Sequence, residues 1–330
     1  MTTIITGNKL AFTETDAHNW CIDTGLNRPG HTACYLLHDN GELAFIDTGT
    51  SNNVPGLLIL IRELGFAPEQ VRWILPTHVH LDHAGGAGAL LKHCKNALLA
   101  THHKGLPHMI DPARLQQGAR DVYGREMFQR CFGSLIPAAE ERCLALHDGE
   151  QLSLGKRHLC FIDTPGHANH HGCFFDQESA SLYTGDSFGL HYRALDRQGI
   201  PWLMATTTPV AFDPASWMKS LDKMMAMQPE LACLTHFGLL RQPGNWQRQL
   251  RESIQSHADI ALQEERAGVK EGRQQRLARV LLEAAVTQVR QHNPDISRDH
   301  IERLLTDDIR LNSQGLDIWL TRREKKRLAG

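Results

Sequence analysis

The sequence carries His78-Val79-His80-Leu81-Asp82-His83 shortly after the apolar run Val71-Arg72-Trp73-Ile74-Leu75. Four of the six residues have side chains that bind metal ions. His78, His80 and Asp82 share one parity, so an extended backbone would turn all three to the same side, while His83 turns inward where the next segment coils. The hexapeptide therefore predicts a metal site that could hold two ions. Taken alone, it also fits a polar surface loop with hydrogen-bonded histidines.

The composition is that of a soluble globular protein. The chain has 330 residues, of which 41% are hydrophobic and 22% charged, enough for one large or two ordinary domains. A formal net charge of -2 gives no field that would gather nucleic acid or an anionic membrane. The first seven residues lack a basic region and an apolar stretch of signal length, and no later stretch approaches about eighteen apolar residues. We expect a cytoplasmic protein with no nucleic-acid or membrane partner.

The cysteines are expected to be reduced core residues. They are scattered without a C-x-x-C pair and lie mostly inside apolar runs. A cysteine zinc site is the alternative, which this spacing does not favour. The eight are Cys21, Cys34, Cys94, Cys131, Cys143, Cys160, Cys173 and Cys233.

The first half of the chain predicts strands alternating with helices. Asp39-Asn40-Gly41 is the residue choice of a tight hairpin turn between strands at 32–37 and 43–46. Pro55 in a first turn and Gly65 just past an end indicate a helix over 54–64. Further along the chain we expect a strand at 71–75, a helix from Gly85 to Cys94 and a short strand at 97–100.

The second half repeats strands that end at polar loops and then turns helical. Residues 102–142 predict a helical insertion, followed by strands at 158–162, 173–176, 181–184 and 231–235 and a helix at 213–227. From about 247 onward apolar residues recur at helical spacing, interrupted at Gly268, Gly272 and Asn293-Pro294. We expect a catalytic domain over 1–243, which includes the insertion, and an α-helical extension over 244–330 whose basic end is a solvated helix face.

Three more residues with ligand side chains follow predicted strands. His167 follows the strand at 158–162, Asp186 that at 181–184, and His236 that at 231–235. Individually these could be a loop histidine, a turn residue and a helix cap. Strand ends at one edge of a sheet converge on a crevice, which is where α/β proteins place their chemistry. Jointly with the hexapeptide, these residues complete a coordination set.

In order and spacing, these motifs resemble the metallo-β-lactamase-fold superfamily over roughly residues 15–240. The matching motifs are Thr77-His78-Val79-His80-Leu81-Asp82-His83, Pro165-Gly166-His167, Thr184-Gly185-Asp186 and Thr235-His236, preceded by Phe45-Ile46-Asp47-Thr48-Gly49. The resemblance implies an α/β fold, an αββα four-layer sandwich. It implies that His78, His80 and His167 bind a first metal, that Asp82, His83 and His236 bind a second, and that Asp186 bridges them. Asp47 would brace the site as a hydrogen-bond acceptor, or form a plain turn.

The chemistry of the residues supports this assignment. Five imidazoles and two carboxylates without a thiolate suit two divalent ions, of which Zn(II) is expected and Fe or Mn possible. A shared carboxylate can hold two ions about 3.5–4 Å apart with a solvent oxygen between them, and a bridging hydroxide is the expected nucleophile. Asp82 and Asp186 are the expected catalytic carboxylates. His170 and His171 are expected in supporting or surface positions, because the ligand count is already complete.

The leading hypothesis is a metal-dependent hydrolase that cleaves an ester, thioester or lactone of a small metabolite. A thiol-ligated β-lactamase would carry cysteine at Asp186, and a flavodoxin-like phosphate loop is missing, so antibiotic hydrolysis and a fused diiron oxidoreductase are disfavoured. A phosphodiesterase, a mono-iron sulfur dioxygenase acting on persulfides, and a binding or regulatory protein stay open.

We expect pocket walls from the insertion and from the loop at 188–193. The C-terminal helices would close the entrance or form a homodimer contact. The expected wall residues are His102, His103, His108, Tyr123, His191 and Tyr192.

Overall fold

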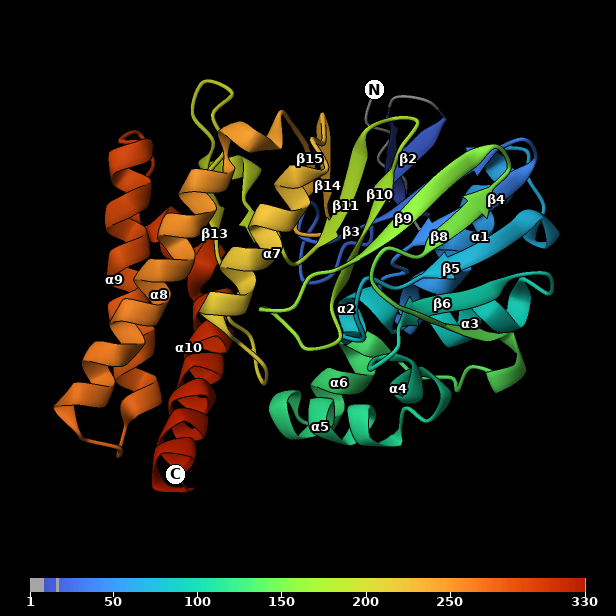
Figure 1. The fold of residues 1–330 in the computed structure, drawn as a ribbon. Coiled ribbons are helices and arrows are strands. Elements are labelled where there is room, and N and C mark those ends of the chain that lie inside the picture. Colours follow the sequence, from blue (N-terminus) through green and yellow to red (C-terminus); the bar gives the residue numbers. More distant parts are fainter. Residues whose placement is uncertain (1–8, 16–17, 330) are drawn as a thin grey trace.

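Two β-sheets lie face to face between layers of helices (Figure 1). The computed structural model describes residues 9–15 and 18–329. The expectation about the first seven residues therefore falls outside the described chain. The first sheet has the order β1 (Ala11–Glu14), β2 (Asn19–Asp23), β3 (Ala33–Asp39), β4 (Glu42–Ile46), β5 (Val71–Leu75), β6 (Leu98–His102) and β7 (Cys143–Leu146). The second has the order β15 (Gly238–Arg241), β14 (Leu231–Leu234), β11 (Ser181–Gly185), β10 (Gly172–Asp176), β9 (Arg157–Asp163) and β8 (Gln151–Leu154).

The period-two pattern of the first strands explains why this sheet is buried on both faces. In β2 to β4, every second side chain packs against helices α1 (Val54–Glu63) and α3 (Ala87–His93): Trp20, Ile22, Cys34, Leu36, Leu43 and Phe45. The residues between them face the second sheet: Cys21, Ala33, Tyr35, Leu37, Ala44 and Ile46. Successive side chains of a strand point to opposite faces, so one sequence pattern supplies two core layers.

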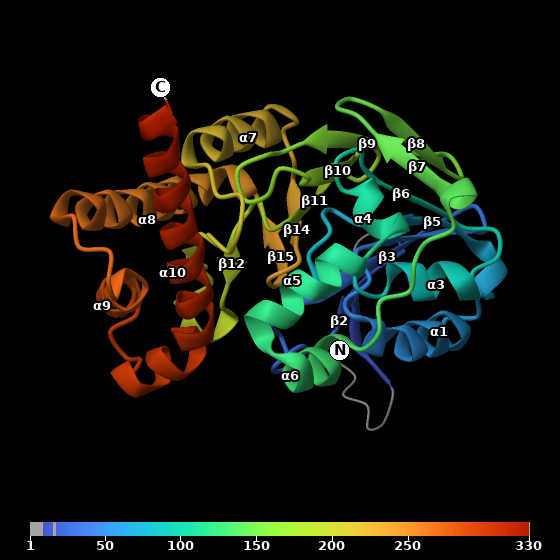
Figure 2. The same ribbon diagram turned by 90° about the horizontal axis from the view of Figure 1, so that it is seen from below.

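Helices of the second half cover the other sheet. Its outer face packs on α7 (Pro214–Ala226), which contributes the fully buried Trp217, and on the C-terminal helices. Those are α8 (Gln247–Ala267), α9 (Arg273–His292) and α10 (Arg298–Ala329), and Figure 2 shows them side by side at one end of the molecule. The helix–sheet–sheet–helix order with a C-terminal helical region confirms the expected fold class.

The predicted insertion consists of three short helices beside the hexapeptide. They are α4 (Leu106–Ile110), α5 (Ala113–Tyr123) and α6 (Arg125–Phe132). Leu81, the apolar residue inside the hexapeptide, is buried against Phe128 and Phe132 of α6. The insertion therefore holds the loop that carries the histidines.

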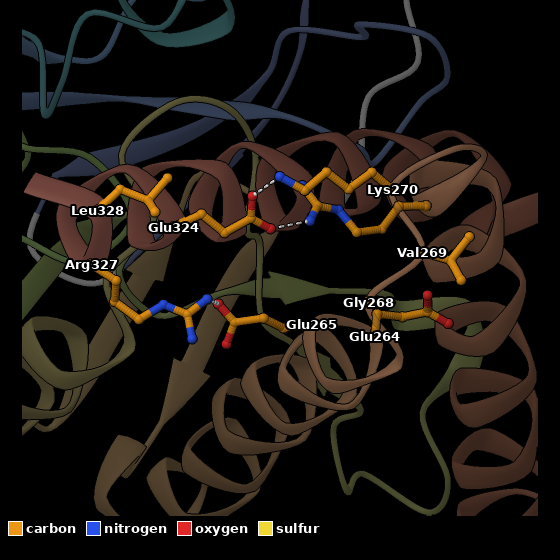
Figure 3. A pocket seen from close by; sticks show the side chains of 9 residues that line it. Glu264, Glu265, Gly268, Val269, Lys270, Glu324, Arg327 and Leu328 are labelled. Carbon is orange, nitrogen blue, oxygen red and sulfur yellow. Dashed lines mark hydrogen bonds and ion pairs between the residues drawn. The ribbon is translucent and has the colours of Figure 1, made fainter.

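Ion pairs fasten the ends of the C-terminal helices to one another. Glycines with left-handed backbone, Gly268 at φ 72° and Gly272 at φ 66°, separate α8 from α9, as predicted. In the pocket of Figure 3, Glu324 of α10 accepts from Lys270 at 2.6 Å and from an Arg273 nitrogen at 2.8 Å, while Arg327 pairs with Glu265 at 2.9 Å. The basic end is thus partly paired within the chain, so its description as a solvated face was incomplete.

Other sequence expectations have mixed outcomes. The eight cysteines form no disulfide with one another, and all but Cys131 and Cys143 are buried. None of the helices within residues 9–15 and 18–329 is both long and apolar enough to cross a membrane. A small sheet of β12 (Leu190–His191) and β13 (Leu203–Met204) was not predicted. The domain boundary near 243 stays a prediction.

Candidate metal centre

Four strand ends bring the predicted ligand residues to one place. β5 of the first sheet leads into the loop before the short helix α2 (Leu81–Ala84), while β9, β11 and β14 of the second sheet lead to His167, Asp186 and His236. The residues come from the ends of strands in both sheets, rather than from one sheet edge as the sequence suggested. Their side chains form two groups that could hold a metal ion: His78, His80, His167 and Asp186, and Asp82, His83 and His236.

In the first group, the imidazole nitrogens of three histidines lie close to one another. Nδ1 of His80 lies 2.8 Å from Nε2 of His78 and 3.1 Å from Nε2 of His167. Oδ2 of Asp186 lies 3.3 Å from Nε2 of His167. Ligand atoms bound at about 2.0–2.2 Å around one tetrahedral ion are separated by about 3.3 Å. The spacing of this group is therefore close to that of a coordination shell.

The second group faces the other oxygen of the same aspartate. Oδ1 of Asp186 lies 3.1 Å from Nε2 of His83 and 3.3 Å from Nε2 of His236. Oδ2 of Asp82 lies 3.3 Å from Nε2 of His236. Asp186 thus stands between the groups with one oxygen toward each.

Partners outside the centre fix the direction of three of the five histidine rings. Nδ1 of His83 donates to Asp47 at 2.8 Å, Nδ1 of His167 to the Thr206 carbonyl at 3.0 Å, and Nδ1 of His236 to the His31 carbonyl at 3.2 Å. Because Nδ1 of each of these rings carries the proton that it donates, Nε2 of the neutral ring presents a lone pair to the centre.

Asp47 ties the two sheets together beneath the site. Its carboxylate accepts from the Thr77 backbone N–H at 2.8 Å and from the Thr235 hydroxyl at 2.9 Å, besides His83. Its backbone is left-handed at φ 57°, a conformation that aspartate tolerates better than most residues. These hydrogen bonds join Asp47 to a ligand histidine and to residues beside two others, and its role as a brace of the metal site stays a prediction.

Two glycines permit the close approach of the strand ends. A Cβ on Gly185, at φ 49°, would lie 2.6 Å from Nε2 of His171 and 2.7 Å from Oγ1 of Thr77. A Cβ on Gly166 would lie 2.4 Å from the Cα of Trp217. Each glycine precedes a ligand residue, so a side chain there would displace Asp186 or His167.

The electrostatics differ between the two groups. Burial lowers the pKa of His78 well below its usual value, and the neighbouring His83 lowers it further. Burial also acts to lower the pKa of His83, but the carboxylates of Asp186, Asp82 and Asp47 outweigh it and raise that pKa well above its usual value. The second group is therefore a place of concentrated negative charge in which a cation is stabilised.

Two buried atoms of the centre face each other without a well-aligned hydrogen bond. Within the described chain, Nε2 of His83 and Oδ1 of Asp186 lie 3.1 Å apart, an ion-pair distance, and neither makes a hydrogen bond of good geometry. The centre brings together imidazole nitrogens and carboxylate oxygens, which are ligand atoms that suit divalent metal ions.

The alternation of side chains that an extended backbone would give stops within the hexapeptide. His80 caps α2, so the chain already coils at Leu81, and Asp82 leaves the side of His78 and His80 to join His236. The prediction that Asp82 points with His78 and His80 from one extended segment was wrong for this reason.

The neighbouring histidines support the site from behind. His171 accepts from the Asp186 backbone N–H at 3.1 Å and contacts the Thr164 hydroxyl at 2.8 Å. His170 lies over His78 with ring centroids 6.2 Å apart. Both agree with the expected supporting positions.

Four of the expected pocket-wall residues belong to the insertion: His102, His103, His108 and Tyr123. Tyr123 is 38% exposed, and its ring packs on Phe132 of α6 with ring centroids 5.1 Å apart. His102 bonds Asp163 at 3.1 Å and stacks on His103. His108 of α4 lies 6.4 Å from His170 between ring centroids, so it is near the first group.

His191 and Tyr192 are engaged inside the protein. His191 uses both ring nitrogens, with the Phe237 carbonyl at 2.9 Å and Asp196 at 3.0 Å, which leaves neither for a substrate. The Tyr192 hydroxyl donates to Asp308 of α10. Sequence reasoning missed Asp308, His31 and Asn312 because their partners lie more than one hundred residues away in sequence and no short motif marks them.

Comparison with known proteins agrees with this geometry. The model of the metallo-beta-lactamase superfamily matches residues 27–236. A metallo-beta-lactamase fold-containing protein of Sulfurisphaera tokodaii is 26% identical over 70% of this chain and 84% of its own, and a hydroxyacylglutathione hydrolase of Fuscovulum blasticum is 26% identical over 64% and 68%. The crystal structure of an archaeal superfamily protein from Sulfolobus tokodaii superposes with a TM-score of 0.57 at 23% identity, covering 87% of this chain and 93% of that one. The chain therefore belongs to the metallo-beta-lactamase superfamily of metal-dependent hydrolases.

Proposed function

We propose that the protein is a dinuclear metal-dependent hydrolase that cleaves an ester, thioester or lactone of a small metabolite. The observation that carries the proposal is the position of Asp186, whose two oxygens face two separate ligand groups. His78, His80 and His167 would hold the first ion, Asp82, His83 and His236 the second, and Asp186 would bridge them. The donor set suits Zn(II), with Fe or Mn as alternatives.

A bound metal pair would supply a solvent nucleophile at neutral pH and polarise the substrate carbonyl. The protein's own part is to orient and to accept protons. The Asp82 side chain is 23% exposed, more than the histidines beside it, so its carboxylate is the group of the second set that substrate and solvent can reach. The buried Asp186 would keep the two ligand groups at a fixed separation.

The carboxyl-ester class is favoured by a relative rather than by geometry. The hydroxyacylglutathione hydrolase among the relatives bears an acyl-group hydrolase name and matches over about two thirds of each chain. A phosphodiesterase would use the same residues, and a mono-iron persulfide dioxygenase would need only the first group. The presence of a second complete group supports a hydrolase over the dioxygenase.

Turnover and metal content together test the proposal. Protein purified without chelator is expected to hold two ions per chain and to hydrolyse at least one of p-nitrophenyl acetate, an S-acyl glutathione and a short lactone. His80→Ala is expected to abolish that turnover. The matched control is His158→Ala, which removes an exposed histidine of β9 that pairs with Glu178.

Three outcomes would contradict the proposal. They are fewer than two ions per chain, a higher rate on bis-p-nitrophenyl phosphate than on every carboxyl substrate, and oxygen uptake with glutathione persulfide in place of hydrolysis. The possible homodimer and the capping or dimerising role of the extension stay predictions, which light scattering on the full chain addresses.

A further inference from the structure

The C-terminal helix α10 contacts the backbone segments that orient two of the histidines. Asp308 and Asn312 are four residues apart on α10, and positions so spaced share one helix face. Both side chains point inward, since Asn312 is fully buried and Asp308 is 13% exposed. Each begins a short series of contacts that ends at a histidine of a different group.

The first series leads from Asp308 to His236. Oδ2 of Asp308 lies 3.6 Å from Nε2 of His31, an ion-pair distance, and the Tyr192 hydroxyl holds the same carboxylate. Nδ1 of His31 donates to the Leu26 carbonyl at 3.1 Å, which fixes the ring. The backbone carbonyl of His31 accepts from Nδ1 of His236 at 3.2 Å, and the two rings lie 5.5 Å apart. Asp308 thereby holds the residue that sets the tautomer of His236.

The second series leads from Asn312 to His167. Oδ1 of Asn312 accepts from the Thr207 N–H at 2.7 Å, and Nδ2 donates to the Ala205 carbonyl at 3.1 Å. The residue between them, Thr206, offers the carbonyl that accepts from Nδ1 of His167 at 3.0 Å. Asn312 therefore clamps both sides of the peptide that orients His167.

The helix backbone is fitted closely to the same segment. A Cβ added to Gly315 would lie 1.6 Å from the Thr207 carbonyl oxygen. The Thr207 hydroxyl also donates to the Asn312 carbonyl at 3.2 Å. Backbone at this distance leaves no room for α10 to shift without moving the 205–207 segment.

We propose that α10 positions one histidine of each metal group, His236 through Asp308 and His31, and His167 through Asn312 and the Thr206 carbonyl. The inference rests on the proposed dinuclear site. Partners that orient a ligating histidine typically change metal affinity 10–100-fold when removed. By reciprocity, metal binding stabilises the docked position of α10 to the extent that docking raises metal affinity. The extension is thus a working part of the centre, and Asp308 and Asn312 are positioning residues.

Zinc titration of the full-length protein against a chromophoric chelator tests the proposal. The two dissociation constants are assigned with His236→Ala and His167→Ala as references. Asp308→Asn is expected to weaken the constant that His236→Ala removes by about 10-fold or more, and Asn312→Ala the constant that His167→Ala removes. If Asn312→Ala does not fold, Asn312→Asp removes the Nδ2 donor at the same size.

Two substitutions on the same helix serve as matched controls. Asp307→Asn makes the same chemical change at the exposed neighbouring position. Asp317→Asn removes an ion pair with Arg273 of α9 and so loosens α10 away from the 205–207 segment. Both are expected to keep wild-type zinc constants. Hydrogen exchange gives a readout independent of turnover, since zinc is expected to slow exchange along α10 in the wild type and less in Asp308→Asn.

The outcomes separate the two proposals. If the wild type binds two zinc ions and Asp308→Asn and Asn312→Ala weaken neither constant beyond the effect of Asp317→Asn, the role of α10 is overturned and the dinuclear site stands. If the wild type binds fewer than two ions, both proposals are overturned.

Discussion

Oδ1 of Asp186 and Nε2 of His83 are buried and face each other across 3.1 Å, an ion-pair distance, without a well-aligned hydrogen bond among the residues that the structure describes. Burial acts to raise the pKa of Asp186, but His83, His236 and His167 outweigh it and hold that pKa well below its usual value. The carboxylate is therefore kept ionised between two sets of imidazoles, the state in which it can share two cations.

Asp186→Asn is expected to remove the shared anionic ligand while keeping the shape of the side chain. Metal content should fall from two ions to one or fewer, and hydrolysis of the best carboxyl substrate should fall by more than about 100-fold. Elemental analysis and initial rates measure both. Asp163→Asn, at the end of β9 but paired with His102, is the control. Two retained ions in Asp186→Asn would contradict the bridging role.

Removal of metal is expected to destabilise the protein. Chelation leaves the carboxylates of Asp82, Asp186 and Asp47 close together in a buried site, and ions that bind only the folded state stabilise it by about 2.7 kcal/mol at a concentration of 100 times the dissociation constant. Thermal unfolding with zinc and with EDTA measures the shift. His236→Ala is expected to show a smaller shift. Equal unfolding temperatures in zinc and in EDTA would count against a metal centre here.

Asp47→Asn tests the brace beneath the site. The amide keeps one acceptor oxygen but places a donor opposite either Nδ1 of His83 or the Thr77 N–H, which both need an acceptor. We expect metal affinity to fall about 10–100-fold with the fold retained. Circular dichroism together with zinc titration separates loss of affinity from loss of fold, and an unchanged affinity would assign Asp47 to a simple turn.

Much of the fold was accessible from the sequence because local signals and tertiary structure agree. The hairpin turn at Asn40 and Gly41 has the predicted left-handed backbone, at φ 47° and 81°, and β5 has the predicted bounds. No separate strand was predicted at β1, β2, β7, β8 or β15, because each of them has only four or five residues. Strands of this kind are defined by their neighbours in the sheet.

The candidate ligands were also accessible, because each follows a recognisable strand in a short polar motif. Their division into two groups was not derivable from spacing alone, since it depends on the chain coiling at Leu81. The contacts of Asp308 and Asn312 were beyond reach for another reason. They depend on how α10 docks on a segment about one hundred residues earlier, and helical periodicity identifies the buried face without naming its partner.

The buried thiols are expected to resist modification in the folded protein. Burial raises the pKa of Cys94 and of Cys173 to about 12, so the reactive thiolate is scarce at neutral pH. An aromatic disulfide reagent should label the half-buried Cys131 before unfolding, Cys143 more slowly because burial raises its pKa to about 11, and all eight cysteines in denaturant. Mass spectrometry identifies the sites. Rapid native labelling of Cys94 or Cys173 would contradict the burial of those strands and helices.

His257 of α8 is expected to make the protein less stable in mild acid. It is 6% exposed, burial lowers its pKa from 6.5 to about 4, and its Nδ1 has no hydrogen-bond partner among the described residues. Since the folded-state pKa is lowered, the unfolded chain binds the proton more readily, so stability is complete above about pH 6.5 and declines as the pH falls toward 4. Between pH 7 and pH 5 this group accounts for a loss of about 2 kcal/mol in the free energy of unfolding.

His257→Leu should remove that part of the decline and leave stability at pH 7 equal or higher, because an unpaired buried nitrogen is replaced by an apolar side chain. Urea unfolding of both proteins at pH 7 and pH 5, with chelator present so that metal affinity does not contribute, measures the difference. His300→Leu, at a solvent-accessible position of α10, is the matched control. A wild-type decline that persists unchanged in His257→Leu would assign the acid sensitivity to other groups.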